Sequence, residues 1–100
     1  MAQVPYNSVV GFAYAHINGA ATTAVKGKPG MLNSLVINSA ANGATITMYD
    51  NTAGSGTVIG IITLGAAETV PTQALLYQVT FLTGLTIVTT GAIDMTVVFR

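Results

Sequence analysis

Two runs rich in β-branched residues, joined by a glycine-rich turn, occupy the middle of the sequence from Gly43 to Leu64. In the first run, Ile46 and Met48 alternate with threonine and tyrosine, which is the period of a strand with one buried face. Asp50 and the segment Gly54 to Gly56 supply residue types that favour turns. The segment is therefore predicted to be a β-hairpin, and the rest of the chain repeats its pattern.

Turn dipeptides and prolines divide the chain into short segments of strand composition, and no segment shows the 3.6-residue apolar spacing with caps that marks a helix. The predicted strands cover residues 9–17, 21–25, 31–38, 44–49, 57–64, 73–81, 85–89 and 92–99. This spacing of short strands and turns predicts an all-β double-sheet sandwich or a closed barrel. We expect an eight-stranded jelly-roll-like sandwich over residues 9–100, preceded by an N-terminal arm at 1–8, with an immunoglobulin-like sandwich as the alternative.

Alternation also predicts which side of each strand is buried. Residues 73–81 place their large apolar side chains at odd positions, which are expected to form core. In residues 9–17 the larger side chains stand at positions 10, 12 and 14, so Phe12 and Tyr14 are expected to face inward. Residues 31–38 are apolar on both sides, with positions 35 and 37 on one face and 32 and 36 on the other. This pattern is typical of a strand at the centre of a sandwich or one covered by another subunit.

Charge is scarce. The charged residues make up 6% of the chain, against about 25% in ordinary soluble domains, and they are Lys26, Lys28, Asp50, Glu68, Asp94 and Arg100. A formal net charge of zero removes the repulsion that keeps free monomers apart. We therefore expect a homo-oligomer whose surface is covered by neighbours. The alternative is a neutral monomer kept soluble by hydroxyl and amide groups.

The sequence also limits the compartment and the cofactors. It contains no cysteine, so neither disulfides nor thiolate metal sites contribute. Its N-terminal residues show no signal-peptide pattern, and no apolar run reaches the length of a membrane span. The expected protein is made in a cytoplasm and binds no membrane. The basic segment 26–28 is too small for a nucleic-acid footprint, so no nucleic-acid partner is expected.

The ionisable residues do not form a recognisable catalytic set. His16 has no clear partner and is expected at a boundary or subunit contact, because metal sites need three or four donors. Asp50 is expected to form an Asx turn, and Asp94 to face outward from a strand. The glycine-rich segment 54–57 lacks the lysine and helix of a phosphate-binding loop. We therefore expect no enzyme, no catalytic residue, no metal site and no cofactor.

A series of strand and turn motifs from residue 30 to residue 92 resembles the small all-β virion proteins of tailed bacteriophages, in particular head decoration or cement proteins and related fibre domains. The motifs are Gly30, Leu32, Ser34-Leu35, Ile37-Asn38, Thr45-Ile46-Thr47, Tyr49-Asp50-Asn51, Gly56-Thr57-Val58-Ile59-Gly60, Phe81, Gly84-Leu85 and Thr89-Thr90-Gly91-Ala92. Residues 9–25 carry no part of the resemblance.

The resemblance implies a jelly-roll-like capsid decoration protein that resides in the virion. Such proteins bind the assembled head, often as trimers, and reinforce contacts between major capsid subunits. Uncharged apolar faces suit this role because few charges need to be desolvated on docking. The candidate interface residues are Val4, Pro5 and Tyr6 in the arm, and Phe99 and Arg100 at the other end of the chain.

The alternative function is a phage fibre or glycan-binding β-sandwich module. Such modules present exposed aromatic rings beside amide and carboxylate groups. Tyr49, Asp50 and Asn51 are the candidate glycan contacts under that alternative.

Overall fold

The computed structural model describes residues 11–65 and 73–100. Every element in these ranges is a β-strand, and they contain no helix able to cross a membrane. The strands are β1 (Ala13–Asn18), β2 (Ala21–Lys26), β3 (Gly30–Ala40), β4 (Thr45–Asp50), β5 (Thr57–Thr63), β6 (Gln73–Phe81), β7 (Leu85–Thr90) and β8 (Ile93–Phe99). The eight strands predicted from alternation are confirmed, with ends that differ by a few residues.

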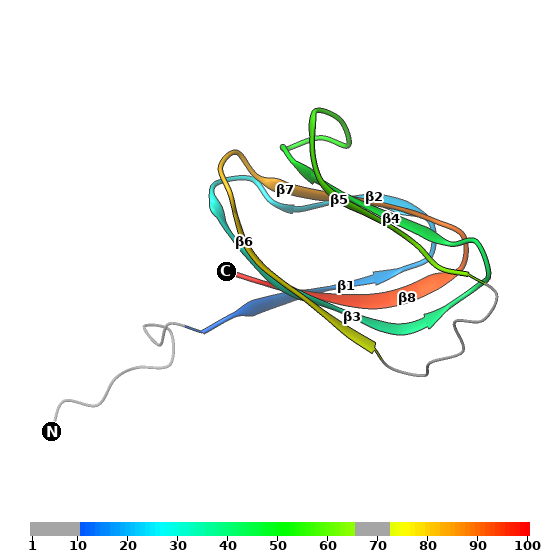
Figure 1. Cartoon of the computed structure of the whole chain (residues 1–100). Coiled ribbons are helices and arrows are strands. Elements are labelled where there is room, and N and C mark those ends of the chain that lie inside the picture. The colour runs from blue at the N-terminus through cyan, green and yellow to red at the C-terminus, as the bar shows by residue number, and fades with distance from the viewer. Residues whose placement is uncertain (1–10, 66–72) are drawn as a thin grey trace, which may run out of the picture.

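The strands form two four-stranded antiparallel sheets that pack face to face (Figure 1). The first sheet has the order β1-β8-β3-β6, and the second has the order β2-β7-β4-β5. Among consecutive strands only β4 and β5 share a sheet, and they form the hairpin predicted at 43–64. This strand order is that of a jelly roll, so the first-choice fold is confirmed over the immunoglobulin-like alternative.

The core lies between the inward faces of the two sheets. The largest fully buried apolar side chains are Phe81, Leu32, Leu35, Ile46, Met48, Leu85, Ile87, Met95 and Val97. Strand β6 buries Phe81 and turns its other odd-numbered apolar residues toward the same cluster, as predicted. Each strand thus contributes one face to the core because side chains alternate along it.

The predicted orientation of β1 is wrong. Tyr14 is 75% exposed and Phe12 is 46% exposed, whereas Ile17 is 3% exposed. The strand takes its phase from Ile17, which is buried in the core, and Ala15 packs against the same core. The size of the other side chains was therefore a poor guide, and two aromatic rings lie on the surface.

The face expected for Leu32, opposite that of Leu35, is also wrong, because β3 is bulged. Its register on β8 shifts between Leu32 and Ser34. A bulge inserts one extra residue and reverses the alternation, so Leu32 and Leu35 both point into the core and Val36 points outward, half-buried. The central position expected for this strand is correct, since β3 lies between β8 and β6.

One open side of the sandwich is closed by an aromatic side chain. Strands β5 and β6 are the edge strands on that side, and Tyr77 of β6 reaches across to β5. A Cβ atom on Gly60 would lie 2.8 Å from the Tyr77 hydroxyl oxygen and 3.2 Å from Cε of Met48. A side chain at position 60 would therefore displace the ends of the Tyr77 and Met48 side chains.

Replacement of Thr89 by valine is expected to destabilise the fold by about 1–3 kcal/mol. Thr89 is 2% exposed, and its hydroxyl donates to the Gly19 carbonyl at 2.8 Å and accepts from the Ala21 amide at 3.1 Å. Valine has the same shape but leaves both backbone groups without this partner. Urea unfolding monitored by circular dichroism measures the change.

Thr47→Val is the matched control, because Thr47 faces outward from β4. It should change the free energy of unfolding by no more than about 0.5 kcal/mol. Equal effects of the two substitutions would contradict the assignment of Thr89.

Candidate interaction surfaces

Exposed apolar side chains lie on the outer faces of both sheets. The first sheet exposes Phe12 just before β1, Tyr14 on β1 and Leu76 on β6. The second exposes Val58 and Ile61 on β5. Single exposed apolar residues are common on soluble proteins. Here they stand on faces with very few charges, and the described charged residues other than Asp94 lie at strand ends or in connections.

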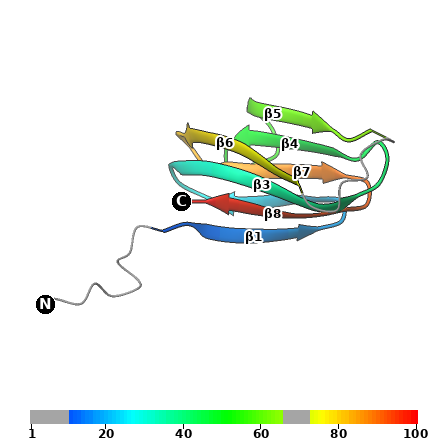
Figure 2. The ribbon, with the colours of Figure 1, turned by 60° about the horizontal axis from the view of Figure 1, so that its bottom comes forward.

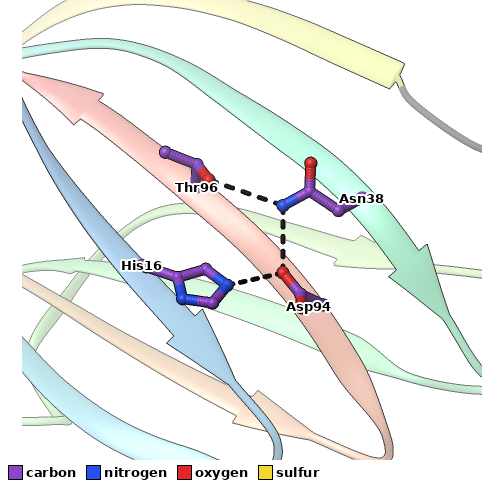
Figure 3. Close-up of polar contacts among 4 residues, drawn as sticks. All are labelled: His16, Asn38, Asp94 and Thr96. Carbon is purple, nitrogen blue, oxygen red and sulfur yellow. Dashed lines mark hydrogen bonds and ion pairs between the residues drawn. The ribbon is translucent and has the colours of Figure 1, made fainter.

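A polar cluster crosses three strands of the first sheet on its outer face (Figure 3). The Asp94 carboxylate oxygen Oδ1 accepts from His16 Nε2 at 2.7 Å and from Asn38 Nδ2 at 2.9 Å. Asn38 Nδ2 also lies 3.4 Å from the Thr96 hydroxyl oxygen. His16 and Asn38 thus connect β1 and β3 to β8 through the Asp94 carboxylate.

The strand register explains why these residues meet. His16 is opposite Thr96, so Asp94 is its diagonal neighbour on β8, within reach of a long side chain. Asn38 lies where the register of β3 shifts between Ile37 and Ser39. The extra residue of a bulge is re-aimed, which brings the Asn38 amide onto the carboxylate.

The cluster stabilises the ionised form of Asp94. The hydrogen bond from Asn38, and next the hydrogen bond from His16, lower the pKa of the Asp94 carboxyl, while partial burial opposes this shift. Side-chain exposures of 50% for His16 and 33% for Asp94 leave the pair open to solvent. No group of three metal-ligating side chains occurs in residues 11–65 and 73–100. The arrangement therefore favours a structural role, in which surface hydrogen bonds hold β1 and β3 to β8.

Sequence reasoning missed the partner of His16, although Asp94 was correctly expected to face outward. The two residues are 78 positions apart, so no local pattern joins them. The jelly-roll order could have found the pair, because it places the first strand beside the last. Asn38 and Thr96 carried no such signal, since bulge positions are not visible in alternation.

The candidate interface residues divide into three groups. Arg100 lies at the surface with its guanidinium carbon 5.2 Å from the centre of the Phe12 ring, a cation–π contact. Phe99 is half-buried and packs against the core cluster. Val4, Pro5 and Tyr6 lie outside the described residues. Arg100 is thus the member of the set that the structure places on the surface, next to an exposed ring.

Asp50 joins the end of β4 to the turn between β6 and β7. Its carboxylate accepts from the backbone amides of Leu82 at 2.9 and 3.0 Å, Thr83 at 2.8 Å and Gly84 at 3.4 Å. The bonds from Leu82 and then Thr83 lower the pKa of Asp50. The carboxylate therefore accepts backbone N–H groups as expected, but from a distant turn rather than from its own.

The glycan-contact candidates already have partners within the protein. Asn51 donates from its amide to the Ser55 carbonyl at 2.7 Å and accepts from the Thr52 amide at 2.8 Å. The backbone carbonyl of Asn51 accepts from the hydroxyl of Thr86. Tyr49 is half-buried on β4. The glycan alternative stays a prediction, and Asp50 and Asn51 would have to give up internal bonds to serve it.

The connection between β4 and β5 covers part of the second sheet (Figure 1). A Cβ atom on Gly54 would lie 2.8 Å from Val88 and 3.2 Å from Thr22, so the loop rests on the outer side of β7 and β2. Thr86 beneath the loop is 1% exposed. The outer face of the second sheet is therefore partly closed by the chain itself.

An open pocket of about 350 Å³ lies at the end of the sandwich where three connections meet. Its wall consists mostly of small side chains and backbone, with Asn18, Ser39 and Asp94 as its polar side chains. These groups do not combine an acid, a base and a nucleophile in the manner of an active site.

Comparison of the chain with protein-family models, with curated proteins and with solved structures found no match. Function is therefore inferred from the fold and from these surfaces.

Asp50→Asn is expected to lower the melting temperature by several degrees. An amide has one accepting oxygen in place of two, and its NH₂ group opposes the Leu82 amide, which contacts both carboxylate oxygens. Asp50→Glu keeps the charge on a longer side chain, so its melting temperature should lie between those of the parent and of Asp50→Asn. Thermal unfolding at neutral pH measures all three proteins, and an unchanged melting temperature for Asp50→Asn would contradict the role assigned here.

Acid is expected to destabilise the fold through Asp50 and Asp94. Hydrogen bonds hold the pKa of both carboxyls below the ordinary value of 3.8, so the unfolded chain binds protons more readily than the folded one. Their stabilising contribution is present above that ordinary value and is lost as the pH falls through the folded pKa. Melting temperatures between about pH 2 and about pH 6 should therefore drop at the acid end. The Asp50→Asn/Asp94→Asn double variant should show a shallower drop, and a parallel curve would exclude these carboxyls as the cause.

Proposed function

We propose that the protein is a structural component of a virion, a capsid decoration protein that binds the head of a tailed phage as an oligomer and reinforces it. The observation that carries the proposal is a jelly-roll sandwich whose outer sheet faces expose apolar side chains and very little charge. Jelly rolls are recurrent in viral capsid proteins. Because fold alone does not define function, the surface is the second support.

Docking of such a surface costs little desolvation. Buried charges must be paired, and on the outer face of the first sheet the Asp94 carboxylate already has partners in His16 and Asn38. Tyr14 and Leu76 on the same sheet offer apolar area to a neighbour. The face can therefore be covered without leaving a carboxylate unpaired.

The positions of the basic residues support a proposal for the end that meets the head. Lys26 and Lys28 flank the start of the connection from β2 to β3, and Arg100 follows β8. A Cβ atom on Gly30 would lie 2.9 Å from the Lys26 ammonium nitrogen, and the backbone of Met31 is bonded to that of Arg100. The three cations thus gather at one end of the sandwich, where they would face an acidic region of the major capsid protein.

Binding to heads tests the proposal. Heads assembled without the protein are incubated with purified protein and pelleted, and their thermal disruption is followed by release of DNA. We expect saturable co-sedimentation and a higher disruption temperature. The Lys28→Glu/Arg100→Glu variant should lose most of the binding because like charges then face the capsid.

Thr22→Glu/Thr63→Glu is the control, since it adds the same number of acidic residues on the second sheet. It should bind as the parent does. Failure of the parent protein to pellet with heads, or binding without any effect on their stability, would contradict the proposal.

A further inference from the structure

Four strands lie at the edges of the two sheets: β1 and β6 in the first, and β2 and β5 in the second. An edge strand presents unpaired backbone N–H and C=O groups that can pair with another chain. Proteins usually protect such edges with bulges, prolines or charged side chains. The four edges of this protein differ in this respect.

Three of the edges are interrupted. The register of β2 shifts between Ala24 and Lys26, and the strand ends on that lysine. In β5, the residue Ile59 is inserted where Val58 and Gly60 pair with consecutive residues of β4. In β6 the register on β3 also shifts, and Gln78 adopts a φ of 52°. Each of these strands is bent or twisted away from regular pairing.

The remaining edge, β1, is regular (Figure 2). Its six residues pair with β8 in unbroken register, from Ala13 opposite Phe99 to Asn18 opposite Asp94. It contains no proline and no lysine, arginine, aspartate or glutamate. The imidazole of His16 on this strand is hydrogen-bonded to Asp94 on β8.

The direction of the free backbone groups follows from one hydrogen bond. The Gly19 amide donates to the Ile93 carbonyl at 2.7 Å, and bonded pairs alternate along an antiparallel ladder. Residues of the same parity as Gly19 therefore bond to β8. The N–H and C=O groups of Tyr14, His16 and Asn18 point instead to the open edge.

We propose that β1 pairs with β1 of a second copy of this chain, antiparallel across a two-fold axis, so that the first sheets of the two copies become one continuous sheet. Regular pairing requires an uninterrupted strand on both sides, and β1 alone meets this condition among the edge strands of the part of the chain described. A two-fold axis brings identical strands together, and like charges on them would oppose the pairing. Strand β1 contains no aspartate, glutamate, lysine or arginine. Exposed Phe12 and Tyr14 add apolar area beside the new ladder.

This inference does not depend on the capsid role. The pair has twice the 10.2 kDa mass of the chain, whereas the resemblance to decoration proteins implies a trimer. Native mass therefore tests the pairing separately from binding to heads.

Native mass spectrometry and amide hydrogen exchange by NMR test the proposal on the full chain. We expect a dimer, and we expect the amides of Tyr14, His16 and Asn18 to exchange on the order of tenfold more slowly as the protein is concentrated into the dimer range. A monomer or a trimer at high micromolar concentration would overturn the proposal. So would exchange at these amides that is independent of concentration.

Two substitutions at one position separate backbone pairing from a general effect of surface change. Tyr14→Pro removes an N–H that points to the open edge, and edge strands tolerate proline there; Tyr14→Lys sets like charges near each other across the axis. Both should abolish the dimer while the circular dichroism spectrum stays that of a folded sandwich.

Ile61→Lys is the matched control, because Ile61 is 63% exposed on the β5 edge. It adds the same charge as Tyr14→Lys and also removes an exposed apolar side chain, and the dimer should persist. Dissociation by Ile61→Lys with a dimer retained in both Tyr14 variants would assign the interface to β5 and overturn the proposal.

Discussion

Apolar packing between two sheets is the contact on which the rest of this structure depends. The hydrogen-bond ladders hold strands within each sheet, but the sheets meet mainly through side chains such as Phe81 and Leu32 on one side and Met48 and Ile87 on the other. With so few charged residues, little else could hold the two layers in register. The hydrogen bonds of Asp50 and Thr89 hold two connections, at Thr83 and at Gly19, against this core.

Alternation was sufficient to predict the strands and the sandwich because the burial of one strand face has a period of two. It failed where the period is broken. The bulges of β3 reverse its phase after Leu32, and the phase of β1 is set by Ile17 rather than by its larger aromatic residues. Bulges and edge positions are tertiary properties, so a local pattern does not contain them.

The surface features were less predictable for the same reason. His16, Asn38 and Asp94 come from three strands and meet only once the strand order and one bulge are known. Asp50 was expected to serve its own turn, yet it binds a turn more than thirty positions away. The scarcity of charge, in contrast, is a property of composition and could be read directly. It is also the property on which the proposed function rests.

The jelly-roll order has a consequence for synthesis of the chain. Within the described residues, the first strand pairs with β8 alone, and the two are joined by contacts between residues as far apart as His16 and Asp94. While the ribosome is still adding the intervening residues, β1 has no strand to pair with. Pairing of β1 must therefore wait until residues 93–99 have emerged, and such non-local pairing is slow. Until then, the backbone groups of β1 that bond to β8 in the folded protein stay without these partners.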